Sequence, residues 1–293
     1  MKPPPFEYYA PRTRQEALEL LSEHAGEAKV LAGGQSLVPS MNFRLAQPSI
    51  LVDLNGVEDL FGIQPHEEGG LLVGAMTRHR SVERSPLVAE RAPLIFEAMP
   101  YIAHPQIRNR GTFGGSLAHA DPAAELPALV VALDAQVRVQ NATGDRWIPA
   151  SDFFLGLFTT ALEPDEMLVE VAVPPLPART GTGFEEFARR HGDYALVGAA
   201  AVVTLAQDGT VADSKLVFLS VGDMPLLALS AADALKGQRP TEEAIRAAAE
   251  ALDADIDPQA DIHATAEYRR HLAKVLARRT LSRAAQRANG NGS

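Results

Sequence analysis

The stretch "RNRGTFGGSLAHADPAAELPAL", from Arg108 to Leu129, places two adjacent glycines beside a serine, a histidine and acidic residues. A glycine inside a regular element costs about 0.5–1 kcal/mol relative to alanine, so a glycine pair between ordered segments indicates a need for unusual backbone angles or close approach. A second pair lies in "LAGGQSL", from Leu31 to Leu37. Both pairs follow an apolar or extended segment, and a Ser-Leu dipeptide comes soon after each.

The two glycine pairs together predict an anion site. Glycines let backbone N–H groups converge on an anion without a Cβ in the way, and the serine hydroxyls add donors. Two such loops suit the two phosphates of a dinucleotide, whereas either pair alone is better explained as a plain tight turn. Neither pair follows G-x-G-x-x-G or G-x-x-x-x-G-K-[ST], which excludes the Rossmann and P-loop interpretations.

The composition narrows the classes of partner and cofactor. The chain has 293 residues, 46% of them hydrophobic, and a formal net charge of −10, which argues against nucleic acid. Without cysteine it has no disulfide, zinc-thiolate site or iron–sulfur cluster of its own, and its scattered histidines predict no metal site. No apolar run approaches the length of a membrane helix, so we expect a cytoplasmic protein.

The hydrophobic patterns predict an α+β protein. The first part alternates strand, helix, strand, helix, strand and indicates a small parallel unit, with a capping box at Thr13. The middle part contains two hairpins, in "GIQPHEEGGLLVGAM" and "AQVRVQNATGDRWIPA", and a helix over about 88–98. Strands at 199–205 and 215–221 precede helices that begin near Thr241 and Tyr268. We place the boundaries at 1–55, 56–177, 178–287 and a flexible tail, 288–293.

Three long segments carry a family resemblance: "LAGGQSLVPSMNFRLAQP", "HPQIRNRGTFGGSLAHADPAAELPAL" and "FARRHGDYALVGAAA". In this order they resemble the FAD-binding medium subunit of molybdenum hydroxylases, the carbon monoxide dehydrogenase/xanthine dehydrogenase family, and the resemblance covers essentially the whole chain. It implies a two-part FAD-binding domain of the PCMH type, made of the parallel unit and a mixed or antiparallel sheet unit. A C-terminal antiparallel three-stranded sheet with helices is expected to follow.

The resemblance also implies which residues bind the cofactor. No residue of this chain is expected to be catalytic, and the glycines are expected to be required because phosphate approaches the backbone. The cofactor-binding residues are expected to be Ala32, Gly33, Gly34, Gln35, Ser36 and Leu37 in the first loop, and Thr112, Phe113, Gly114, Gly115, Ser116 and Ala118 in the second. Gln35 departs from the histidine that carbon monoxide dehydrogenases have there, which leaves the substrate class open.

Six further positions are assigned expected roles. Glu125 is expected on the ribityl side of the flavin, and Asp121 either joins it or caps the helix that follows. Tyr194 either covers the isoalloxazine and gates the acceptor, or is an ordinary buried tyrosine. Arg108 is expected, with its neighbours, to fix the second loop. Packing roles are expected for His104 and His119.

The function implied by the resemblance is electron transfer by a subunit that holds FAD non-covalently. Its partners would be a small subunit with two-iron two-sulfur clusters and a large molybdopterin subunit, in a dimer of heterotrimers, with quinone, NAD, oxygen or a protein as acceptor. The alternatives are a self-contained flavin-dependent reductase or oxidase, and a non-catalytic FAD-binding accessory protein. The sequence leaves open the substrate, the acceptor, the stoichiometry, and whether the basic segment from Tyr268 to Arg287 touches a membrane's inner face, a partner or only this chain.

Overall fold

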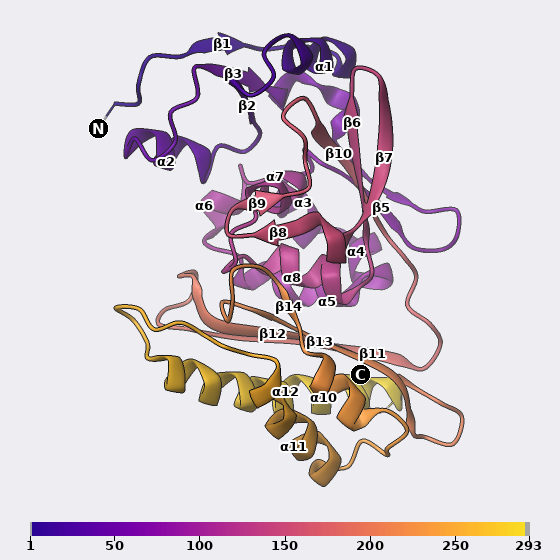
Figure 1. Ribbon diagram of the computed structural model, residues 1–293. Coiled ribbons are helices and arrows are strands. Elements are labelled where there is room, and N and C mark those ends of the chain that lie inside the picture. Colours follow the sequence, from indigo (N-terminus) through magenta and orange to yellow (C-terminus); the bar gives the residue numbers. More distant parts are fainter. Residues whose placement is uncertain (1, 291–293) are drawn as a thin grey trace.

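A computed structural model describes residues 2–290, and its sheets form three tiers along the molecule (Figure 1). The first tier is a parallel sheet of order β1-β3-β2, in which both neighbours pair with β3. Thr13 caps the first helix by accepting a hydrogen bond from the Glu16 amide at 3.2 Å, as the capping box predicts. The predicted parallel unit is confirmed. Its elements are β1 (Glu7–Tyr9), α1 (Arg14–Glu23), β2 (Ala28–Leu31), α2 (Leu37–Asn42) and β3 (Ile50–Asp53).

The middle tier is an antiparallel sheet of order β4-β5-β10-β6-β7, and both predicted hairpins, β4/β5 and β6/β7, are present. Its strands are β4 (Ile63–Pro65), β5 (Leu71–Gly74), β6 (Gln136–Asn141), β7 (Gly144–Pro149) and β10 (Met167–Val173). A small hairpin of β8 (Phe154–Gly156) and β9 (Thr159–Thr160) lies beside the helices. Those helices are α3 (His79–Glu83), α4 (Pro86–Arg91), α5 (Pro93–Ala98), α6 (Pro105–Arg108), α7 (Phe113–His119), α8 (Glu125–Ala132) and α9 (Ala150–Phe153).

One predicted helix of this tier is divided. The segment expected as a single helix over 88–98 is α4 followed by α5, with Ala92 between them at φ −137°. Pro93 causes the break, because proline has no N–H to donate and its ring clashes with the preceding turn. Proline instead occupies the first position of each short helix, where a missing donor costs nothing.

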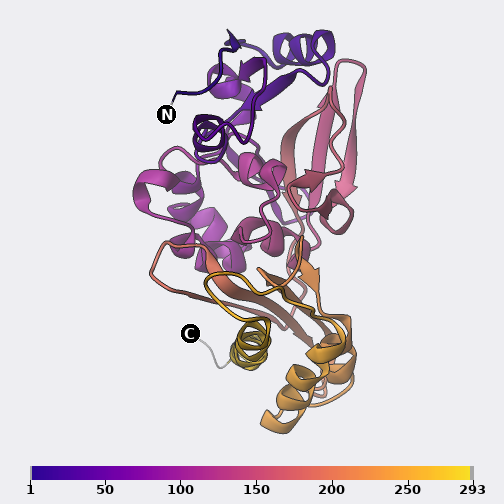
Figure 2. The same cartoon turned by 60° about the vertical axis from the view of Figure 1, so that its left-hand side comes forward.

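The third tier is an antiparallel sheet of order β11-β12-β13-β14, covered on its outer face by helices (Figure 2). The expected three strands are joined by a fourth, β14, whose two residues pair with Val217 and Phe218. The elements are β11 (Thr180–Ala188), β12 (Ala195–Leu205), β13 (Val211–Leu219), β14 (Leu226–Leu227), α10 (Leu229–Leu235), α11 (Glu242–Ala251) and α12 (Ala266–Ala288). Of the expected tail, residues 291–293 lie outside the described residues.

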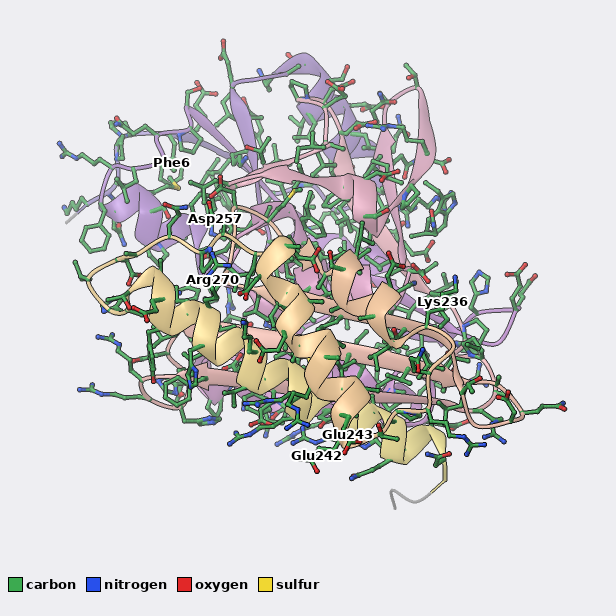
Figure 3. The ribbon with its side chains drawn as sticks, turned by 60° about the horizontal axis from the view of Figure 1, so that its bottom comes forward. Phe6, Lys236, Glu242, Glu243, Asp257 and Arg270 are labelled. Atoms are coloured by element: carbon green, nitrogen blue, oxygen red, sulfur yellow. The ribbon has the colours of Figure 1, made fainter. Side chains whose placement is uncertain are left out.

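The basic residues of the long helix α12 form ion pairs within this chain. Its apolar face is buried on β11 and β12, and its cations pair with acids of this chain: Arg279 and Arg283 with Glu185, Arg287 with Glu97, and Lys274 with Glu250 and Asp253. Figure 3 shows Arg270 beside Asp257, with which it forms an ion pair at 3.6 Å. The positive charge of α12 is thus largely neutralised within the chain. Across residues 2–290, no helix has both the length and the apolar character needed to cross a membrane.

Candidate functional site

The first glycine pair lies in the loop between β2 and α2, and it forms a run of free backbone donors. Within residues 2–290, the N–H groups of residues 33 to 37 donate no hydrogen bond to the rest of the chain. Gly34 has φ +71°, a left-handed conformation that other residues adopt at a cost, and it turns the chain between strand and helix. Successive unpaired amides at such a turn form a concave site for an anion. The loop therefore has the donor set that the sequence predicts.

The two glycine pairs meet in space, as the sequence predicts. A Cβ on Gly33 would lie 2.4 Å from the carbonyl oxygen of Arg110 and 2.8 Å from the Cα of Gly111. A Cβ on Gly115 would lie 3.3 Å from the Cβ of Ala32. The first loop therefore rests directly on the backbone that leads into the second, and a side chain at Gly33 would force them apart.

The second pair differs from expectation, because Gly114 and Gly115 lie in the first turn of α7 and not in an open loop. The amide of Gly114 donates to the carbonyl oxygen of Ala75 at 2.8 Å, and the amide of Gly115 to the capping hydroxyl of Thr112 at 3.2 Å. A Cβ on Gly114 would lie 2.7 Å from the Cβ and 2.8 Å from the Cα of Ala75. Close packing of α7 against the chain after β5 therefore requires Gly114, and the expectation that phosphate also approaches this pair stays a prediction.

The segment before α7 is fixed by two buried side chains. Arg108, 5% exposed, donates to the carbonyl oxygens of Ile102 and Ala103 at 2.8 Å each and forms an ion pair with Glu83 at 3.1 Å. The Nε2 atom of His79 lies 2.9 Å from the carbonyl oxygen of Thr112, and burial lowers the pKa of His79 to about 4. A neutral imidazole and a buried guanidinium thus hold this segment, which agrees with the expected role of Arg108.

The remaining site residues of the second segment follow from the course of α7. Ser116 and Ala118 lie on α7, and no residue between 2 and 290 forms a hydrogen bond with the Ser116 hydroxyl. Asp121 does not cap α8, since Ala124 occupies the cap position; its carboxylate accepts from the Ala123 amide at 2.9 Å instead. The capping interpretation of Asp121 is therefore wrong.

Acidic side chains gather where α8 meets the C-terminal sheet. Glu125 opens α8 and is 8% exposed, and burial raises its pKa to about 7, with the nearby charge of Asp121 adding to the shift. Glu186 on β11, which the sequence did not single out, has a buried carboxyl oxygen without a hydrogen-bond partner among the described residues. Burial and the charge of Glu125 raise the pKa of Glu186 to about 8. Near neutral pH, Glu186 is therefore largely protonated and Glu125 about half protonated, and a protonated carboxyl can donate a hydrogen bond.

Tyr194 stands at the edge of this acidic group. Its side chain is 66% exposed, so the interpretation as an ordinary buried tyrosine is wrong. Desolvation of its hydroxyl, then the charges of Asp121 and Glu125, raise its pKa. The loop before it packs on His104, since a Cβ on Gly192 would lie 2.4 Å from that ring. His119 contacts the Phe158 ring, with centroids 5.0 Å apart, so both histidines have the expected packing roles.

The packing of Gly114 generates a stability prediction. We expect Gly114→Ala to lower the free energy of unfolding by about 1–3 kcal/mol, because the added methyl group overlaps the backbone of Ala75. Urea unfolding followed by circular dichroism measures the change. Gly144→Ala is the matched control, since a Cβ at Gly144 meets no atom within 4 Å. Equal stability of the two variants would contradict the packing role.

The buried carboxyls generate a pH prediction. A carboxyl whose folded pKa exceeds its unfolded value keeps its proton in the folded state, so its contribution to stability is lost as pH rises through the folded pKa. From pH 5 to pH 8, we expect Glu186→Gln to lose about 3 kcal/mol less stability than the unmodified chain. Glu67→Gln, at an exposed position, should leave the pH dependence unchanged. Parallel stability curves for Glu186→Gln and the unmodified chain would show that Glu186 ionises normally.

Two family models and several known proteins match this sequence. Residues 4–176 match the family described as the FAD binding domain in molybdopterin dehydrogenase, and residues 182–284 match the CO dehydrogenase flavoprotein C-terminal domain. The 6-hydroxypseudooxynicotine dehydrogenase complex subunit alpha of Paenarthrobacter nicotinovorans is 43% identical, over 98% of this chain and 97% of that relative.

Solved structures agree over the same span. Carbon monoxide dehydrogenase from Hydrogenophaga pseudoflava, in a form lacking the Mo-pyranopterin moiety, superposes with a TM-score of 0.94 at 41% identity, covering 98% of this chain and 99% of the other. Quinoline 2-oxidoreductase from Pseudomonas putida 86 gives a TM-score of 0.92 at 40% identity, with the same coverage.

Proposed function

Because the chain belongs to the family of FAD-binding medium subunits of molybdenum hydroxylases, we propose that its free loop amides hold the diphosphate of FAD. The run of unpaired N–H groups from residue 33 to residue 37 is the observation that carries this proposal. The residues fit the group, because an anion satisfies backbone donors that have no hydrogen-bond partner among residues 2–290. The hydroxyls of Ser36 and Ser116 would be further hydrogen-bond donors to the diphosphate.

The acidic group at the far end of α7 fits the rest of the cofactor. Helix α7 spans about 10 Å between the glycine loops and Asp121, which separates the amides from the carboxyls. Protonated Glu125 would donate to a ribityl hydroxyl and Asp121 would accept from another, without placing two negative charges beside phosphate. The exposed ring of Tyr194 would cover one face of the isoalloxazine and control the access of the acceptor.

The proposed function is electron transfer within a larger enzyme. When bound, the flavin supplies a redox centre that accepts electrons one or two at a time. This cysteine-free chain binds and orients that centre, while an iron–sulfur subunit delivers electrons and a molybdopterin subunit oxidises the substrate. We further propose a cytoplasmic dimer of heterotrimers that reduces quinone, NAD, oxygen or a protein. The relatives described as a complex subunit and a medium chain support the multi-subunit part.

Ligand competition tests the diphosphate site. We expect the full chain to bind FAD non-covalently, so that acid precipitation releases all the flavin into the supernatant. ADP, which carries the diphosphate, should displace FAD at concentrations at least tenfold lower than adenosine requires. Flavin fluorescence during titration measures both. Equal potency of ADP and adenosine would show that the loop amides do not bind the diphosphate.

Reduction experiments test the division of labour. The isolated chain loaded with FAD should show no bleaching of the flavin with any aldehyde, N-heterocycle or carbon monoxide, because it has no centre that oxidises them. Adding the iron–sulfur and molybdopterin chains should restore substrate-dependent bleaching in the blue absorbance band. Bleaching by the isolated chain would favour a self-contained reductase or oxidase, and its absence in the full mixture would favour an accessory protein.

A further inference from the structure

We propose that Arg78 and Asn55 are positioning residues that hold the two loops in register for the cofactor diphosphate. The inference rests on the proposed function, because it takes the loop amides as the diphosphate site. Neither residue lies in a glycine motif, and neither contributes a backbone amide to the run from 33 to 37. Their side chains nevertheless form a continuous chain of hydrogen bonds from one loop to the other.

The chain of bonds begins at the end of β3. The carboxylate of Asp53 accepts from the backbone amide of Asn55 at 2.8 Å and from its side-chain Nδ2 at 2.5 Å, which fixes the Asn55 rotamer. The same Nδ2 donates to the carbonyl oxygen of Ala32 at 2.9 Å. Asn55 therefore anchors the residue immediately before the free amides, and it leaves its carbonyl oxygen available on the opposite side.

Arg78 extends the chain to the second loop. One guanidinium nitrogen donates to Oδ1 of Asn55 at 2.5 Å, and the other donates to the carbonyl oxygen of Arg110 at 2.5 Å. That carbonyl oxygen is the atom against which Gly33 packs. One planar side chain thus joins both loops at the point of their closest approach, a geometry that the fork of arginine provides and the single nitrogen of lysine does not.

The positive charge of Arg78 is not neutralised by an ion pair with a described residue. Its guanidinium lies over the Phe61 ring, 5.6 Å from the centroid. Arg110 lies close enough for its charge to oppose that of Arg78, and Asp53 offsets part of the repulsion. The positive charge of Arg78, bonded to the carbonyl oxygen on which Gly33 packs, adds to the unpaired amides a positive field that an anionic ligand relieves.

The experiment compares a phosphate-bearing flavin with one that lacks phosphate. We expect Arg78→Met to weaken FAD binding by the full chain at least tenfold while changing riboflavin binding less than threefold, because the isoalloxazine and ribityl contacts remain. Arg78→Lys, which keeps the charge but not the fork, should recover only part of the loss. Arg84→Met is the control, since Arg84 is exposed and is the C-cap of α3, whose N-cap is Arg78.

A double-mutant cycle separates positioning from a general structural role. If Arg78 acts through Asn55, the losses of FAD affinity in Arg78→Met and Asn55→Leu should not add in the double variant. Unchanged FAD affinity in a folded Arg78→Met, or equal losses for FAD and riboflavin, would overturn the positioning role while leaving the FAD site intact. Failure of the unmodified chain to bind FAD would overturn both proposals. If Arg78→Met does not fold, the same comparison is made with Arg78→Lys and Asn55→Leu. A larger loss of FAD affinity than of riboflavin affinity supports the positioning role, and equal losses overturn it.

Discussion

The contact between Gly33 and the carbonyl oxygen of Arg110 is the constraint on which the site depends. A missing Cβ lets the loop after β2 lie directly on the chain before α7, at a separation that no other residue permits. Elements from the first and middle tiers therefore share one edge, although their sheets are separate. Two buried side chains fix the position of that edge. His79 lies within hydrogen-bond distance of the carbonyl oxygen of Thr112, and Arg108 donates to the carbonyl oxygens of Ile102 and Ala103.

Opposite electrostatic environments are kept apart by one short helix. At the start of α7, the free amides and the guanidinium of Arg78 favour an anion. Beyond its end, Glu125 and Glu186 are desolvated, and protonation relieves the cost of burying two carboxylates side by side. An elongated ligand with an anionic group in the middle and hydroxyls farther along satisfies both environments at once. A compact anion would satisfy only the first.

Much of the fold could be predicted because local signals and tertiary structure agree. The capping box at Thr13, the hairpin turns and the alternating strands each specify their element within a few residues. The site was harder, because sequence indicates where glycines occur but not which contact needs them: Gly33 and Gly114 serve packing, and Gly34 a left-handed turn. Asn55, Arg78 and Glu186 carry no motif, since their roles arise from neighbours distant in sequence.

The C-terminal tier is part of the site and not only a neighbouring layer. Glu186 enters the acidic group from β11, and the loop that ends at Tyr194 connects β11 to β12. The same strand carries Glu185, which pairs with Arg279 and Arg283 on α12. Alternating side chains of one strand thus face the site and the covering helix, so the ion pairs on the outer face help to fix the carboxyl on the inner one. A shift of α12 would therefore displace β11 and move Glu186 relative to Glu125.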